Sequence, residues 1–155
     1  MIQRIQSVYL FLTSVLSILF LKGPLLTFFD NSGSTLQLTK TGLIRFLENG
    51  TPERIGETWM IYIPGLIIPA ISLVTIFLFK NRYLQLLFIR ILMLVILTFL
   101  TTSIIYTFIL LSRFNVEIDS WYRLLVPVMQ LILTYLAFRG IKKDDDLVKS
   151  YDRLR

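Results

Sequence analysis

Few residues of this chain could carry out chemistry, and the most closely grouped are three glutamates of one polar segment, Glu48, Glu53 and Glu57. Two carboxylates held side by side can serve as a general acid and a general base. The same spacing also fits a solvated protein surface. We interpret the three glutamates as such a surface and not as an acid pair.

The residue types that are missing narrow the chemistry further. The 155-residue chain contains no histidine and no cysteine, which excludes imidazole catalysis, thiolate nucleophiles and cysteine-based metal or iron–sulfur sites. Its seven glycines are scattered and form no phosphate-binding loop. We therefore predict that the protein is not an enzyme and has no catalytic residue, no cofactor and no metal site.

The C-terminal segment 139–155 is the best candidate for binding a partner. Its apolar residues fall at i, i+1, i+4 and i+7, on one stripe of a helix: Leu147, Val148, Tyr151 and Leu154. Aspartates 144–146 precede this stripe, and Arg153 and Arg155 close it, as the helix dipole favours. We predict a short amphipathic helix here, separated from the preceding apolar segment by Gly140.

Such a helix of about ten residues is marginal alone in water, so we expect it to form only when its apolar stripe docks on something. The candidates are another loop of this protein, the lipid surface and a second protein. The three aspartates argue against anionic lipid as the main target, because like charges repel. The basic residues are few and mixed with acids, which argues against RNA, and nothing indicates DNA.

Four windows of the chain are long and apolar enough to cross a bilayer, whose core of about 30 Å takes about 20 helical residues. They cover residues 5–21, 59–79, 86–111 and 121–138. None alternates between apolar and polar residues as the strands of a membrane barrel do. Since 55% of the residues are hydrophobic and only 17% are charged, we predict an all-α membrane protein with four transmembrane helices.

Polar groups within these windows are few. Arg90 lies near one end of the third window, where it can reach lipid headgroups or form a salt bridge with a neighbouring membrane protein. All ten carboxylates lie outside the windows, which removes the buried acid that a proton relay needs. Gln130 is the most isolated deep polar residue, and we expect it to form an interhelical hydrogen bond.

The distribution of charge indicates the orientation. With four spans, the two ends of the chain and the second loop share one side, which carries ten basic and four acidic residues. The other side carries six of each. Because basic residues accumulate on the cytoplasmic side, we predict that both termini are cytoplasmic.

The loop 22–58 is the only sizeable one, and we expect a packed lid over the helix ends more than a binding cap. Residues 35–39 alternate as a short strand does, and residues 43–47 suggest an amphipathic turn on the membrane surface. Thr51, Pro52 and Glu53 have the pattern of a helix start, with an N-cap residue followed by proline and an acid.

Prolines in the spans raise one alternative function. Pro64 and Pro69 lie in the second window, and a proline inside a helix removes a backbone hydrogen bond and bends the axis. Paired broken helices form the binding sites of some transporters. A small transporter or channel that uses this bent helix is therefore the alternative to a protein that only binds others.

The two ends of the chain resemble a known family. The opening MIQRIQSVYL, the four spans and the closing IKKDDDLVKSYDRLR are similar to the Bacteroidota membrane proteins grouped as domain-of-unknown-function family 4293. Members of that family more often have a glutamate within the acidic run, and a small residue where Tyr151 stands. The resemblance covers the whole chain and implies a bacterial inner membrane protein, but it implies no activity or substrate.

These observations lead to one functional hypothesis. We predict a non-enzymatic accessory or scaffold subunit of a larger complex in the bacterial inner membrane, with a periplasmic loop at 22–58. Protein translocation is one process that such a complex could serve. Its expected partners are the lipid bilayer and at least one membrane protein. Contacts would be made by the six tail residues named above and by Arg90.

Overall fold

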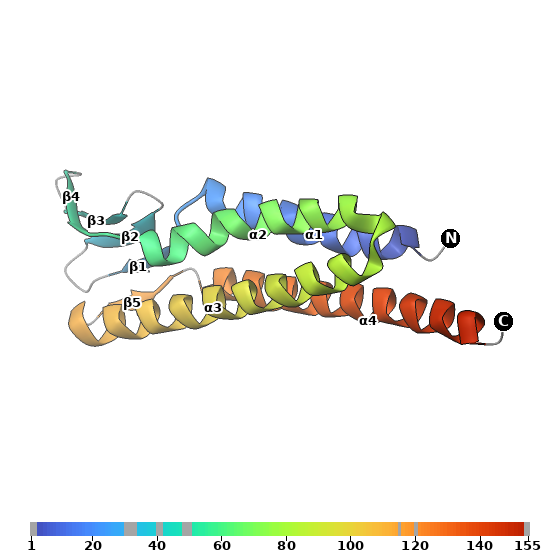
Figure 1. The fold of residues 1–155 in the computed structure, drawn as a ribbon. Coiled ribbons are helices and arrows are strands. Elements are labelled where there is room, and N and C mark those ends of the chain that lie inside the picture. Colours follow the sequence, from blue (N-terminus) through green and yellow to red (C-terminus); the bar gives the residue numbers. More distant parts are fainter. Residues whose placement is uncertain are drawn as a thin grey trace.

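Four long helices form an antiparallel bundle in the computed structural model, which describes residues 3–29, 34–39, 42–47, 51–114, 116–119 and 121–153 (Figure 1). The helices are α1 (Gln3–Lys22), α2 (Trp59–Phe77), α3 (Arg82–Phe114) and α4 (Leu125–Arg153), with short 3₁₀ turns η1 (Leu78–Lys80) and η2 (Trp121–Leu124). Each helix packs against two others, so that the four form a ring in chain order. The start of α1 and the end of α4 lie together at one end of the bundle, which we call the terminal end (Figure 1).

Each of these helices contains a stretch that is long and apolar enough to cross a membrane. Only 28–33% of each such stretch is buried within the protein. Large apolar side chains cover the outside of the bundle, for example Phe108, which is 74% exposed, and Leu94, which is 63% exposed. A continuous apolar surface of this kind requires lipid around it. The chain is therefore a multi-pass membrane protein, and the predicted four helices are confirmed.

A small antiparallel sheet covers the opposite end of the bundle, which we call the sheet end (Figure 1). Its strands are β1 (Leu26–Phe29), β2 (Thr35–Thr39), β3 (Gly42–Phe46), β4 (Pro52–Gly56) and β5 (Glu117–Ile118). Their order across the sheet is β4-β3-β2-β1-β5. The first four strands come from the loop between α1 and α2, and β5 comes from the loop between α3 and α4.

The sheet corrects the prediction of an all-α protein. The strand predicted at residues 35–39 is confirmed as β2, but the amphipathic turn predicted at residues 43–47 is wrong, because that segment forms β3. The helix start predicted at Thr51, Pro52 and Glu53 is also wrong, because Pro52 begins strand β4. β4 is an edge strand, and proline is tolerated there because one side of an edge strand needs no hydrogen-bond donor.

The buried face of the sheet continues the core of the bundle. Leu26 faces Leu38 and Phe28 faces Leu36 across β1 and β2, and all four side chains are at most 1% exposed. They belong to the same buried cluster as Phe20 and other core residues of the helices. The sheet is thus packed onto the helix ends, as expected for a lid over them.

The two prolines of the second span both lie inside α2. Pro69 has no backbone N–H group, so the carbonyl oxygen of Gly65, four residues earlier, loses its usual helical donor. The hydroxyl of Ser17, on α1, donates a hydrogen bond of 2.8 Å to that oxygen. Gly65 also provides room for α1, since a Cβ atom there would lie 3.0 Å from Cδ2 of Leu21. The carbonyl group that Pro69 leaves without a helical donor is therefore bonded to the neighbouring helix.

Candidate functional site

Three helices meet around Asp144 at the terminal end. The Nε2 atom of Gln6, on α1, donates a hydrogen bond of 2.8 Å to Oδ2 of Asp144. A guanidinium nitrogen of Arg82, on α3, donates a bond of 2.7 Å to the backbone carbonyl oxygen of Asp144. Gln6 is only 5% exposed, so little water competes for its amide. These two bonds hold the last part of α4 against α1 and α3.

Gly140 lies one turn before Asp144 and is a packing position within α4. The structure differs here from the predicted separate tail helix, because α4 continues without interruption from Leu125 to Arg153. A Cβ atom at Gly140 would lie 2.9 Å from Cγ of Gln6, so the missing side chain lets α1 and α4 approach closely. The next residue, Ile141, is 2% exposed and belongs to the core.

The residues predicted to bind a partner lie at the end of this long helix. Leu147 and Val148 are 46% and 42% exposed. The other predicted tail residues lie outside the described side chains: Tyr151, Arg153, Leu154 and Arg155. The structure therefore places Leu147 and Val148 on the surface of α4, and the binding role of the stripe stays a prediction.

The outward surface of α4 carries a shallow groove of about 580 Å³. Its lining residues recur at intervals of three and four along the helix: Tyr135, Phe138, Arg139, Lys142, Lys143, Asp146 and Leu147. We call this surface the α4 face. Aromatic rings occupy the part nearer the sheet end, and charged side chains occupy the part nearer the terminal end. The α4 face therefore passes from an apolar to a charged surface within one uninterrupted helix.

Arg90, on α3, packs against α4. The central carbon of its guanidinium group lies 5.9 Å from the centre of the Phe138 ring, which is a cation–π contact. Arg90 also borders a groove between α3 and α4 together with Lys142. Reasoning from the sequence does not bring these residues together. The one signal was the i, i+4 spacing of Phe138 and Lys142, which puts both on one side of a helix.

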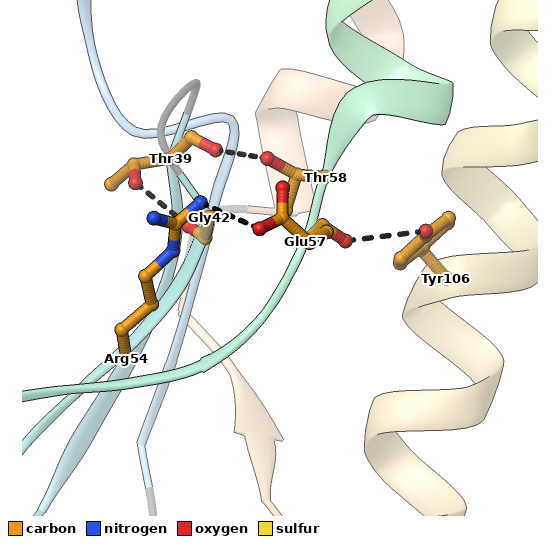
Figure 2. Close-up of polar contacts among 6 residues, drawn as sticks. All are labelled: Thr39, Gly42, Arg54, Glu57, Thr58 and Tyr106. Carbon is orange, nitrogen blue, oxygen red and sulfur yellow. Dashed lines mark hydrogen bonds and ion pairs between the residues drawn. The ribbon is translucent and has the colours of Figure 1, made fainter.

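Figure 2 shows how the sheet is joined to α2 and α3 at the other end of the molecule. The hydroxyl of Thr58, the residue before α2, donates a hydrogen bond of 2.7 Å to the carbonyl oxygen of Thr39, in β2. The hydroxyl of Tyr106, on α3, donates a bond of 3.5 Å to the carbonyl oxygen of Glu57. These contacts fix the start of α2 relative to both the sheet and α3.

The predicted solvated surface of glutamates lies beside this junction. Glu57 forms an ion pair of 3.0 Å with Arg54, and both side chains are more than half exposed (Figure 2). Glu53 is opposite Arg45 in the pairing of β3 and β4, whereas Glu48 lies outside the described residues. Within the described ranges, no group of three or more acidic, histidine or cysteine side chains could hold a metal ion. The arrangement is that of an exposed charged surface.

Polar residues inside the bundle serve contacts between helices. The hydroxyl of Ser72, on α2, donates a bond of 2.5 Å to the carbonyl oxygen of Leu10, on α1. Gln130, on α4, donates a bond of 3.4 Å to the carbonyl oxygen of Thr13, on α1, so the predicted interhelical bond is confirmed. The Oε1 atom of Gln130 is buried and has no hydrogen-bond partner among the residues described.

No curated protein matches the chain. The model of a family described as a domain of unknown function, DUF4293, matches residues 2–154, which is nearly the full length. The match includes all four helices, the sheet and almost the entire charged end of α4. The chain therefore belongs to the DUF4293 family.

Proposed function

We propose that this protein is a non-enzymatic accessory or scaffold subunit of a larger complex in the bacterial inner membrane, and that the α4 face binds its protein partner. A protein translocation assembly is one host of this kind. The observation that carries the proposal is the continuity of α4 from the apolar core to the charged terminal end. A partner helix could follow the α4 face from the lipid into water without meeting a flexible joint.

The chemistry of the α4 face suits a membrane-protein partner. Tyr135 is 54% exposed, and aromatic side chains with one polar end favour the boundary between lipid and water. Arg139 and Lys143 follow at intervals of four residues and are exposed, so they can pair with acidic side chains of a partner. Leu147 adds an exposed apolar side chain at the outer limit of the described surface.

The interior of the bundle gives less support to a transporter or channel. Ser17 and Ser72 bond to backbone carbonyl groups of neighbouring helices, and the core between them is filled by apolar side chains such as Ile68 and Phe99. The Gly65 carbonyl, which lacks a helical donor because of Pro69, is among these bonded positions. A helix that moves during transport would have to break such contacts. We therefore favour a binding function over the alternative that uses the bent α2.

The binding proposal predicts that changes on the α4 face release a partner. In the double variant Lys143→Glu and Leu147→Ser, we expect at least a tenfold loss of a protein that co-purifies with the native chain in stoichiometric amount, because a reversed charge and a lost apolar contact meet in one interface. Lys80→Glu makes the same charge change at an exposed residue of the same end, in η1, and should keep the partner. A photo-crosslinker at Val148 should attach to that protein.

A solitary native protein would contradict the binding proposal. So would a partner that is retained equally by the double variant and by Lys80→Glu. Loss of a transport phenotype on replacing Pro69, in a protein that purifies alone, would instead support the transporter.

The orientation is also part of the proposal, with the terminal end in the cytoplasm and the sheet in the periplasm. The excess of basic residues at the terminal end supports it. Because the native chain has no cysteine, Thr51→Cys and Lys143→Cys each introduce a single thiol at an exposed position. In intact inner-membrane vesicles with the periplasmic side outward, we expect an impermeant maleimide to label only Thr51→Cys. Labelling of both thiols, or of Lys143→Cys alone, would exclude this orientation.

A further inference from the structure

A groove between α3 and α4 at the terminal end combines charges of both signs with an apolar wall. It has a volume of about 380 Å³. Tyr83, Leu87 and Arg90 line it from α3, and Lys142 and Asp146 line it from α4. Within the described ranges, Arg90 and Lys142 form no ion pair with an acid of this protein. The groove thus offers two cationic groups beside a carboxylate, at the edge of the membrane-spanning region.

A second hollow continues from the first toward the middle of the bundle. It has a volume of about 370 Å³ and is lined by Arg90, Met93, Leu94, Leu97 and Leu131. Because Arg90 borders both hollows, they are consecutive along the line where α3 and α4 meet. All lining residues of the second hollow except Arg90 are apolar. The two hollows together have a charged part and an apolar part.

The charged and apolar hollows lie at the depths expected for the headgroup and the acyl chain of a phospholipid. Tyr83 lies in the first turn of α3 and is 75% exposed, as is common for tyrosine at the boundary between lipid and water. Arg90 lies seven residues further along the helix, about 10 Å deeper, and Leu97 lies about 10 Å deeper again. The ring of Phe138 holds the guanidinium group of Arg90 against α4 at this level. A headgroup would lie between Tyr83 and Arg90, and an acyl chain would lie beside Leu94 and Leu97.

The mixture of charges selects among headgroups. Arg90 and Lys142 attract a phosphate, but Asp146 repels a headgroup whose net charge is negative. A phosphoethanolamine headgroup carries a phosphate and, two carbon atoms away, an ammonium group with three hydrogen-bond donors. The ammonium can pair with a carboxylate while the phosphate pairs with arginine and lysine. A phosphocholine headgroup has the same charges, but its nitrogen has no hydrogen to donate.

We propose that this groove binds one phosphoethanolamine lipid, with its phosphate on Arg90 and Lys142, its ammonium group on Asp146, and one acyl chain along Leu94 and Leu97. The lipid fills the line between α3 and α4 and is a specific ligand of the protein. This site shares Lys142 and Asp146 with the α4 face, but Arg90 and the apolar wall belong to the seam between α3 and α4, and the measured ligand is a lipid. Its test therefore does not depend on finding a protein partner.

Native mass spectrometry tests the proposal directly. The protein is stripped of lipid in detergent and offered equal amounts of phosphatidylethanolamine, phosphatidylglycerol and phosphatidylcholine with identical acyl chains. We expect one bound lipid, predominantly phosphatidylethanolamine. Arg90→Gln and Lys142→Gln should each lower its retention about tenfold, because each removes a charged donor to the phosphate. Lys142 is an exposed surface residue, so Lys142→Gln provides a test in a variant that keeps the native packing.

Two further variants separate specific binding from ordinary contact with the bilayer. Lys143→Gln removes a charge from the next residue of α4, which does not line this groove, and should leave lipid retention unchanged. Asp146→Asn should bind phosphatidylethanolamine and phosphatidylcholine about equally. Equal retention of all three lipids by the native protein, or tighter retention of phosphatidylglycerol, would overturn the proposal. So would crosslinking at Leu87 to a protein helix in place of lipid.

Discussion

Ser17→Ala should destabilise the protein by about 1–3 kcal/mol, because it leaves the carbonyl oxygen of Gly65 buried without a donor. That oxygen has no backbone donor of its own, since the residue four positions later is Pro69. Water cannot replace the hydroxyl within the apolar interior of a membrane. The cost can be measured as the change in the free energy of unfolding in mixed detergent micelles.

The reason for the loss can be tested in a second background. In a Pro69→Ala protein, the new backbone N–H group can bond to the Gly65 carbonyl, so Ser17→Ala should cost about 1 kcal/mol less there than in the native protein. Ser103→Ala is a matched control, because the Ser103 hydroxyl bonds to the Phe99 carbonyl, which already accepts a helical N–H group. That change should be close to neutral. An equal cost of Ser17→Ala in both backgrounds would show that the hydroxyl does not compensate for the proline.

Gly140→Ala should also destabilise the protein, by about 1–3 kcal/mol, although alanine is the better helix former by about 1 kcal/mol. The added methyl group would lie 2.9 Å from Cγ of Gln6 and would displace the amide that donates to Asp144. Thermal unfolding in detergent, followed by circular dichroism, gives the sign of the change. We expect a loss of stability because α1 and α4 pack closely at Gly140.

With a smaller residue at position 6, Gly140→Ala should stabilise the protein instead of destabilising it. Gln6→Ala removes the three atoms that would lie nearest to the added methyl group, so in that background the intrinsic preference of alanine should make Gly140→Ala stabilising by up to about 1 kcal/mol. If Gly140→Ala stabilises the otherwise native protein, then α4 is not packed on α1 at this level. The end of α4 would then be a segment separate from the bundle, as predicted from the sequence.

Local composition was sufficient to find the membrane helices. A bilayer requires about 20 consecutive apolar residues, and the windows predicted at 5–21 and 59–79 nearly coincide with α1 and α2. The limits of the fourth helix were predicted less well. Its charged residues end the apolar window at residue 138, but they do not end α4, because the helix is supported by contacts with α1 and α3.

The errors come from residues whose role depends on distant partners. Thr51, Pro52 and Glu53 satisfy the local rules for a helix start, yet the segment pairs with β3, where Glu53 lies opposite Arg45. Gly140 has the local character of a helix break, and only its contact with Gln6, at the other end of the chain, reveals a packing role. Neither partner can be identified from spacing along the sequence.

In the candidate sites, too, the features that depend on local sequence could be predicted and those that depend on distant partners could not. The exposed positions of Leu147 and Val148 follow from helical periodicity, since their spacing is local. The groove between α3 and α4 that contains Arg90 and Lys142 could not be predicted from helical periodicity. It depends on which sides of α3 and α4 face each other. Arg90 could be singled out as an unusual charge near the membrane, but its contact with Phe138 could not.

The two edge strands of the sheet affect whether copies of this protein can pair with one another when they are crowded in the membrane. Every copy of this protein in a bilayer has its sheet at the same height, so neighbouring copies could meet strand to strand far more readily than freely tumbling molecules would. One border is β4, which begins with Pro52 and continues with the exposed charges of Glu53 and Arg54, and the other is β5, which has only two residues. Proline, charge and shortness all oppose the addition of another strand. The sheet can therefore be concentrated in two dimensions without joining its neighbours into a ribbon.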